Sequence, residues 1–249
     1  MKRFLSFFRA TAKPFLLAAL SLIIVTGCEK DDDTTPAGNQ VDMFLYTDAS
    51  GVMVALNTVT YTEVMGTVVP TPFNTATAVF MDQAGSGPFA AAGKVSLNTR
   101  ELSRQGNNAY VYNNALDPLS FNQIQWSVEG SGAIPAINKS LSRGMPSFNG
   151  YASLPQSIDR SAGLSLSLGG QVSNADSLLV SIVQGGKFVE KMVAGNASSV
   201  SFSASELGSL SSGSNGMLQL SPFNITTETI SGKKYYFINQ TTHTRTGIS

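Results

Sequence analysis

Residues that could carry nucleophilic or metal chemistry are few in this chain of 249 residues. It contains one cysteine, Cys28, and one histidine, His243. A Ser-His-Asp or Cys-His mechanism would have to use His243, and no Gly-x-Ser-x-Gly turn leading into a helix accompanies it. Zinc requires clustered histidine, cysteine and carboxylate ligands, which this sequence does not offer. We therefore expect His243 to be a solvated residue of a terminal strand, and we expect neither a metal nor a cofactor.

Carboxylates are the remaining candidates for acid–base chemistry. Glycoside hydrolases use two of them, about 5–10 Å apart across a groove. The sequence cannot pair its acidic residues, most of which lie at predicted strand ends or turns. A carboxylate-dependent glycoside hydrolase, or another surface enzyme, is therefore the alternative to a non-catalytic protein. The acidic residues of the predicted folded part are Asp42, Asp48, Glu63, Asp82, Glu101, Asp117, Glu129, Asp159, Asp176, Glu190, Glu206 and Glu228.

Cys28 follows a segment with the three parts of an export signal. Residues 1–13 contain four basic residues and no acidic one, and residues 15–25 form an apolar run. This run is too short for a transmembrane helix, which needs about 20 residues, and is typical of a signal peptide. Val25-Thr26-Gly27-Cys28 resembles the lipobox of bacterial lipoproteins. The resemblance implies cleavage between Gly27 and Cys28 and acylation of Cys28, which would anchor the protein stably in a membrane.

Residues 28–40 are predicted to form a lipidated, acidic and disordered tether, because they are too polar to bury apolar surface. The acidic residues 29–33 resemble the surface-export signal of Bacteroidota-type lipoproteins, which implies the outer face of the outer membrane. The alternative is a solvated linker whose charges carry no signal. Asp33-Thr34-Thr35 resembles the O-glycan acceptor motif of exported proteins from the same bacteria, which implies glycosylation of Thr34.

The charge of the chain excludes some partners. Removal of residues 1–27 would take away four basic residues and no acidic one, so the mature chain would carry a net charge of −4. Nucleic-acid binding depends on basic side chains that neutralise phosphates, so we do not expect it. We expect no nucleotide either, because no glycine-rich phosphate loop precedes a helix. The expected partners are the membrane, through the lipid, and a glycan or surface protein.

Short runs that alternate apolar and polar residues recur along the chain and predict β-strands. Residues 130–150 are punctuated by glycine and proline, so we expect a domain boundary there. The predicted fold is all-β, with two tandem β-sandwich domains; one large β domain is the alternative that the chain length allows. The two domains are an N-terminal domain over residues 41–147 and a C-terminal domain over residues 148–249, after the signal peptide (1–27) and the tether (28–40). Examples of predicted strands are residues 52–56, 59–64, 77–81, 124–128, 178–183 and 234–239.

Residues 158–249 resemble, in their strand spacing, fibronectin-like modules of exported bacterial proteins. The resemblance depends on residues 159–164 before the first strand, on residues 176–182 as the next strand, and on the turn at residues 203–207. It implies an immunoglobulin- or fibronectin-like sandwich. It implies no particular function, because such folds carry many functions.

Aromatic residues are the remaining candidates for ligand contact. Trp126 lies mid-strand between apolar alternation partners, so we expect it in the core. Tyr110 and Tyr112 share one strand face, and Tyr235 and Phe237 share another. An exposed strip of such rings could stack on a glycan or on another protein. The sequence thus favours a non-catalytic binding or assembly module for a glycan or a surface protein, held at the cell surface by its lipid.

Overall fold

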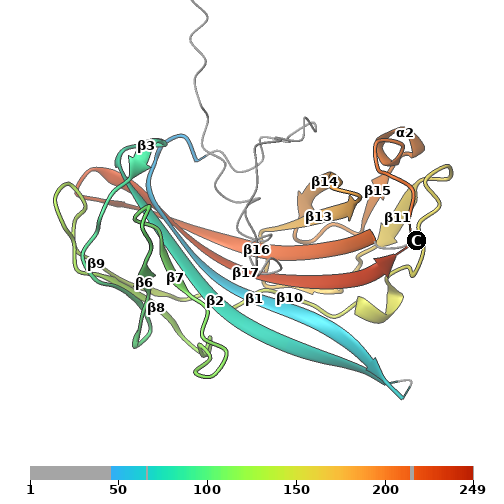
Figure 1. Ribbon diagram of the computed structural model, residues 1–249, viewed down its shortest axis with the longest axis horizontal. Helices are drawn as coiled ribbons and strands as arrows, with labels where there is room; N and C mark the ends of the chain where they lie inside the picture. Colours follow the sequence, from blue (N-terminus) through green and yellow to red (C-terminus); the bar gives the residue numbers. More distant parts are fainter. Residues whose placement is uncertain (1–45, 66, 214–215, 249) are drawn as a thin grey trace, which may run out of the picture.

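The computed structural model describes residues 46–65, 67–213 and 216–248. The predicted all-β, sandwich-like fold is confirmed, since β-strands account for nearly all the regular structure of these residues (Figure 1). The predicted signal peptide and tether, with Gly27, Cys28 and Thr34, lie outside the described residues. The elements are β1 (Ala49–Val64), β2 (Thr67–Gln83), β3 (Ser86–Phe89), β4 (Val95–Leu97), β5 (Arg100–Glu101), β6 (Ser103–Arg104), β7 (Tyr110–Tyr112), β8 (Ile124–Val128), β9 (Ile137–Leu141), β10 (Ser147–Phe148), the 3₁₀ helix η1 (Tyr151–Ser153), β11 (Leu164–Ser167), β12 (Val172–Ser173), β13 (Ser177–Gln184), β14 (Lys187–Ala194), β15 (Ser199–Phe202), α2 (Ala204–Leu207), β16 (Gly216–Ile230) and β17 (Lys233–Ile248).

The largest sheet, here called the long sheet, has the strand order β14-β13-β16-β17-β1-β2-β7-β6, with β3 beside β2. Its four longest strands, β16, β17, β1 and β2, run side by side through the molecule (Figure 1). β1–β2 and β16–β17 are antiparallel hairpins, whereas β1 and β17 pair in parallel from Ala49 opposite Lys234 to Thr60 opposite Thr244. Strands from the two ends of the described chain therefore form the centre of one sheet.

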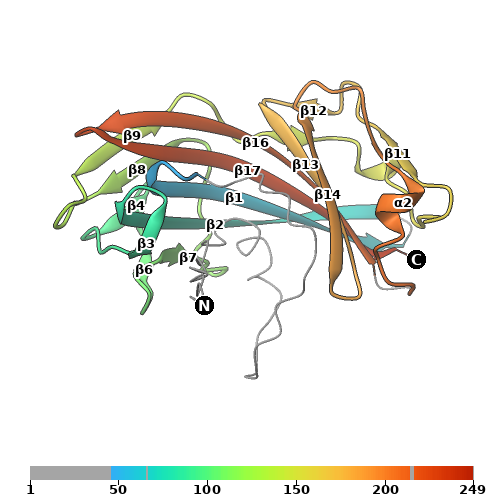
Figure 2. The same cartoon turned by 90° about the horizontal axis from the view of Figure 1, so that it is seen from above.

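Because side chains alternate along a strand, the long sheet has two faces. The face here called the covered face carries Met53 and Phe237 near the start of β1, and Leu220 and His243 farther along. Residues 90–173 and 197–210 provide most of a second layer over this face, and Figure 2 shows the smaller sheets of that layer at opposite ends of the long strands. The opposite face of the long sheet is here called the outer face.

The first core lies between the covered face and a four-stranded sheet with the order β5-β4-β8-β9. β8 shows why these strands form, because its buried residues Ile124, Trp126 and Val128 alternate with the exposed residues Gln125 and Ser127. Trp126 is 0% exposed, which confirms the prediction that it belongs to the core.

The second core lies toward the other end of the covered face, against the two-stranded sheets β10-β12 and β11-β15 and helix α2. β13 contributes Leu178 and Val180, which are both fully buried. α2 begins at a capping box, in which Glu206 N donates to Ser203 Oγ and Ser203 N donates to the Glu206 carboxylate. This start places Leu207 in the second core. Within the described ranges, no helix has the length and apolar character needed to cross a membrane.

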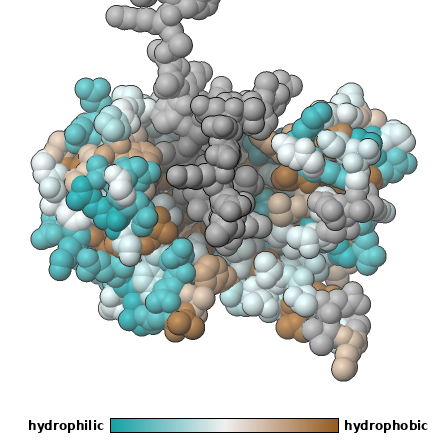
Figure 3. All heavy atoms as spheres, in the orientation of Figure 1, coloured by the Kyte–Doolittle hydropathy of each residue, from teal (hydrophilic) through white to brown (hydrophobic). Residues whose placement is uncertain are grey.

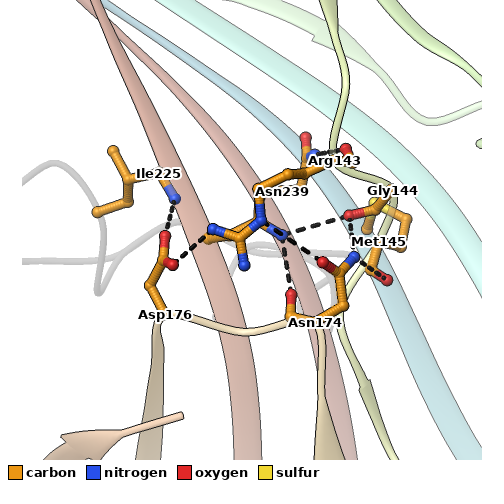
Figure 4. A network of polar contacts seen from close by, with 8 residues as sticks. Arg143, Gly144, Met145, Asn174, Asp176, Ile225 and Asn239 are labelled. Atoms are coloured by element: carbon orange, nitrogen blue, oxygen red, sulfur yellow. Dashed lines mark hydrogen bonds and ion pairs between the residues drawn. The ribbon is translucent and has the colours of Figure 1, made fainter.

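The linker of residues 142–146 joins the two cores and is tied to the long sheet by side-chain hydrogen bonds (Figure 4). Asn239 Nδ2 donates to Arg143 O over 2.9 Å, and Thr241 Oγ1 donates to Pro146 O over 2.6 Å. Both donors lie on β17, in the part of the covered face between the two cores. The long sheet therefore supplies polar side chains where the layer above it is irregular backbone.

The prediction of two tandem domains, residues 41–147 and 148–249, is not confirmed. β1 from the first predicted domain pairs with β17 from the second along most of its length. The predicted boundary falls within β10, and Arg143 on one side of it forms an ion pair with Asp176 on the other (Figure 4). The two cores thus share one sheet, and the segment between them is fastened to it.

Candidate functional site

Three of the four aromatic residues that were predicted to face a ligand are buried. Tyr110, Tyr235 and Phe237 are each 1% exposed or less, and all three belong to the first core. The alternating pattern places Tyr235 and Phe237 on the same strand face, but that face is the covered face of the long sheet. These three rings therefore form no exposed aromatic strip in this structure.

Tyr112, the fourth of these residues, is half-buried. Its hydroxyl donates to Asp117 O over 2.6 Å, and its ring packs against the first core. Tyr110 beside it is held inside, where its hydroxyl accepts a hydrogen bond from Ala92 N. Tyr112 and Tyr110 consequently do not form the exposed aromatic strip that the sequence suggested.

The most prominent projection of the described chain is the end of the β1–β2 hairpin. β17 pairs with β1 only as far as Thr60, and β7 pairs with β2 only nearer the first core. Past these neighbours, residues 61–72 continue as a two-stranded ribbon, here called the arm, in which Tyr61 lies opposite Pro70. Figure 1 shows the arm extending beyond the rest of the sheet.

The arm carries exposed aliphatic side chains near its tip. Met65 is 101% exposed, Val68 is 45% exposed and Val69 is 42% exposed. Elsewhere in the described chain, the large apolar side chains with comparable exposure are Leu116 and Met192, which lie far apart in sequence. In Figure 3, brown and tan atoms are visible at this projecting end, at the lower right, as they are at several other places on this face. Val68 and Val69 are consecutive and so point to opposite faces of the ribbon, which leaves both faces of the arm with an exposed apolar side chain for contact with another molecule.

The sequence of the arm also limits how it can make contact. Glu63 is the only charged residue between Asp48 and Asp82, and this uncharged stretch is the sequence signal that could have identified the arm. Pro70 and Pro72 lie on β2, which has no strand partner on its other side along the arm among the described residues. Proline lacks the N–H group that an added strand would need, so this edge resists strand addition. The arm is suited to contact through its side chains.

An aromatic cluster holds the arm at its base. The rings of Tyr61 and Tyr151 are stacked, with centroids 3.4 Å apart and planes at 15°, and Arg245 Cζ lies 5.3 Å from the centroid of Tyr151. The Tyr61 hydroxyl and His243 Nδ1 are 2.6 Å apart, and Phe148 meets the imidazole ring edge-on at 5.6 Å. A two-stranded ribbon alone is only marginally stable in water, so these contacts fix the direction of the arm.

His243 is buried, so the prediction of a solvated histidine is wrong. Its exposed fraction is 5%, and it lies on the covered face opposite Leu220 of β16. Burial lowers the pKa of His243 from 6.5 to about 4, which keeps the imidazole neutral at pH 7. Its Nδ1 atom faces Tyr61, and its Nε2 atom has no hydrogen-bond partner within the described ranges. In this position the imidazole holds Tyr61 and fills the core.

The acidic residues are mostly engaged with cations or with backbone N–H groups. A general acid needs a raised pKa, and Glu190 is the residue among the described carboxylates whose pKa is raised, because burial disfavours its charge. Glu190 lies on β14, at the edge of the long sheet, where it accepts a hydrogen bond from Ser181 Oγ at 3.3 Å. The hydrolase alternative stays a prediction. The ion pairs are Asp48–Lys234, Asp117–Arg100, Asp176–Arg143, Glu206–Lys191 and Glu228–Lys139.

A depression of about 270 Å³ lies beside Tyr110. Lys94, Glu101 and Arg104 lie along it, and Arg104 is already bonded to Asn108 Oδ1. Among the described residues, no group of three or more His, Cys, Asp or Glu side chains could hold a metal ion. The depression therefore offers side chains of both charges at exposed strand ends. The arm remains the stronger candidate for a binding site.

Comparison with known proteins finds no family model, no curated protein and no solved structure that matches this chain. Functional inference consequently depends on the sequence motifs and on the geometry described above.

Proposed function

We propose that this chain is a lipid-anchored protein of the bacterial outer membrane that faces the cell exterior and acts as a non-catalytic binding or assembly module. The observation that carries the binding role is the arm, with Met65, Val68 and Val69 exposed together near its tip. The lipobox-like residues 25–28 and the acidic residues 29–33 support the anchor and its location.

The chemistry of the arm favours a protein partner over a glycan. Sugar rings stack on open aromatic faces, whereas the ring of Tyr61 in the arm is stacked on Tyr151. Aliphatic side chains suit an apolar groove on another protein, where a fully buried valine or methionine contributes about 1.5–3 kcal/mol. The arm thus supports contact with a protein surface.

The length of β1 supports a position of the arm away from the anchor. Tyr46 is the first described residue and lies beside the start of β1, whereas the arm lies at its other end. The 16 residues of β1, at about 3.3 Å each, span about 50 Å. A tether that joins the body before Tyr46 would therefore leave the arm free to meet a partner.

Anchoring is tested at Cys28. Cys28→Ser is expected to abolish incorporation of labelled palmitate and to release the protein from the membrane fraction, because the sulfur atom is the lipid acceptor in this proposal. Protease treatment of intact cells is expected to degrade the unaltered protein. A Cys28→Ser protein that stays in the membrane fraction, with no label in either form, would contradict the anchor.

The arm is tested by replacing its three aliphatic side chains with polar ones of similar size. Met65→Gln, Val68→Thr and Val69→Thr together are expected to weaken partner binding by about tenfold or more, because apolar area leaves the interface. The measurement is photo-crosslinking from residue 67 in intact cells, where a discrete adduct should form and be lost in the triple variant.

Leu116→Gln combined with Met192→Gln is the matched control, since it removes the same kind of exposed side chain outside the arm. This control is expected to leave the adduct at its original yield. An adduct that survives the triple variant, or that disappears equally in the control, would exclude the arm as the contact. Both variants change exposed positions, so each should alter the free energy of unfolding by less than about 0.5 kcal/mol.

A further inference from the structure

Three asparagine side chains, here called the amide row, lie on neighbouring strands of the covered face between the two cores. Asn57 of β1 lies opposite both Asn74 of β2 and Thr241 of β17. Asn239, the third member of the row, precedes Thr241 by two residues. Each member stands an even number of residues from a first-core side chain of its own strand, so all three point to the covered face. Neighbouring side chains on one face of a sheet lie about 5–8 Å apart, so Asn57 adjoins the other two.

Backbone carbonyl groups orient two of these amides. Asn74 Nδ2 donates to Leu119 O over 2.7 Å, and Asn239 Nδ2 donates to Arg143 O over 2.9 Å (Figure 4). A carbonyl oxygen only accepts hydrogen bonds, so the NH₂ end of each amide must face the backbone. The Oδ1 atom of each amide is therefore left for some other contact.

The oxygen atoms of the amide row are buried and unpaired. The Oδ1 atoms of Asn57, Asn74 and Asn239 have no hydrogen-bond partner among the described residues, and Asn239 is 0% exposed. An unpaired buried acceptor is costly, because it has lost its hydrogen bonds to water. All three atoms are the negative ends of amide dipoles, so together they favour a positively charged group.

The sheet leaves these oxygen atoms accessible to one another. Ala55 of β1 lies opposite Asn239 on one side and opposite Ala76 of β2 on the other. Both alanines carry a single methyl group, so no long side chain of β1 or β2 separates Asn239 from the other two members of the row. Asn57 and Asn74 are half-buried, so a small ion could reach the row from the side of β2.

The chemistry of the row selects the kind of ligand. One water molecule donates two hydrogen atoms, which is fewer than three acceptors require, whereas a cation needs acceptors alone. Calcium and magnesium sites in proteins depend on carboxylate ligands, and the row contains none. Neutral oxygen ligands without a carboxylate are therefore better suited to a cation that carries a single charge.

We propose that the Oδ1 atoms of Asn57, Asn74 and Asn239 bind a monovalent alkali cation, sodium or potassium, between the two cores. The cation joins β2, β1 and β17 at the level where the linker of residues 142–146 lies over the sheet. It stabilises the sheet between the cores in the same way as the hydrogen bonds from β17 to the linker. This site does not depend on the arm or on the lipid anchor.

The test compares salts at equal ionic strength. The full chain, in detergent, is unfolded by heat in the chlorides of sodium, potassium and N-methylglucamine, and the fluorescence of Trp126, the only tryptophan, reports unfolding. The unfolding equilibrium constant should be about tenfold lower in one alkali chloride when its cation is at about ten times the dissociation constant. N-methylglucamine is too large for the site and supplies screening alone. Equal unfolding in all three salts would mean that ordered water alone meets the oxygen atoms, and would overturn the proposal.

Asn57→Leu removes the central oxygen atom with little change in volume and is expected to abolish the difference between the salts. The lost oxygen has no partner among the described residues, so this variant should still fold. Asn138→Leu, at an exposed position of β9, is the matched control and should keep the full difference. A difference that survives Asn57→Leu, or that disappears equally in the control, would overturn the site.

Asn57→Asp supplies a second variant, whose expected effect is a gain. The added carboxylate should tighten binding of the alkali cation by about tenfold or more and should make stability respond to calcium. Asn138→Asp adds the same charge on β9 and should change neither property. Equal responses of the two aspartate variants would contradict a cation at the amide row.

Discussion

Replacing Trp126 by alanine is expected to lower the free energy of unfolding by about 3–5 kcal/mol, the largest effect of any single change considered for this chain. Trp126 is 0% exposed and packs with Tyr235 and Phe237 of the long sheet in the first core. Truncation would leave a cavity between two sheets, which cannot close without shifting long paired strands. Urea unfolding followed by far-ultraviolet circular dichroism measures the change.

Trp126→Phe is the matched control. The Trp126 Nε1 atom is buried and has no hydrogen-bond partner in the described part of the chain, so phenylalanine removes a donor that gains nothing there. The cost of this change is expected to be less than half that of Trp126→Ala. Equal losses in the two variants would mean that the indole N–H, and not the filled volume, is what stabilises the core.

The same variant tests whether the two cores unfold together. β1 and β17 pair along most of their length and carry residues of both cores, so loss of the first core should weaken the sheet under the second. We expect one cooperative transition in Trp126→Ala. Backbone amides around position 126 and around His243 should lose their protection from hydrogen exchange at the same urea concentration. Two separate transitions would restore the interpretation as tandem domains.

The positions of individual strands can be predicted from the sequence better than their lengths. Residues 52–56 and 59–64 are predicted as two strands, yet they belong to the single strand β1, which continues through Asn57 and Thr58. Polar residues can occupy the middle of the long strands because the covered face there lies against the backbone of the linker, whose carbonyl groups accept hydrogen bonds from them. Asn239 of β17, which donates to Arg143 O, is the clearest case.

The topology could not be predicted from local patterns. The partner of β1 is β17, which begins at Lys233, and nothing in either strand specifies a parallel neighbour so distant in sequence. That pairing converts two expected domains into two cores on one sheet. Alternation grouped Tyr235 with Phe237 correctly, but it could not say that their face of the sheet lies inside.

The candidate site was missed for a related reason. Aromatic rings and catalytic groups do not identify the arm, because it carries aliphatic residues on a two-stranded ribbon that has no further strand partner among the described residues. Val68 and Val69 look like ordinary strand residues in the sequence. Their exposure depends on the tertiary structure. The pairing of β17 with β1 ends at Thr60, and the β1–β2 ribbon continues beyond it.

Acidification from pH 6.5 to pH 4 is expected to lower the free energy of unfolding by up to about 3 kcal/mol through His243 alone. The folded pKa of His243 is about 4 because of burial, against 6.5 for an unperturbed histidine. The unfolded chain therefore binds a proton in this range that the folded chain does not, so stability is complete above pH 6.5 and declines as the pH falls toward 4. The carboxylates with lowered pKa values, such as Asp48, contribute stability that is lost only at a lower pH, where they become protonated.

His243→Gln separates this effect from all others, because glutamine can still bond to the Tyr61 hydroxyl but does not titrate in this range. Urea midpoints measured at several pH values between 7 and 4.5 should decline in the unaltered protein and stay nearly flat in the variant. Burial raises the pKa of Glu190, so the folded chain binds a proton there more readily than the unfolded chain does. Acidification therefore stabilises the folded state through Glu190, which opposes the decline in both proteins. Since His243 is the only histidine, an unchanged slope in His243→Gln would show that the imidazole is solvated after all and that the base of the arm is not closed as described.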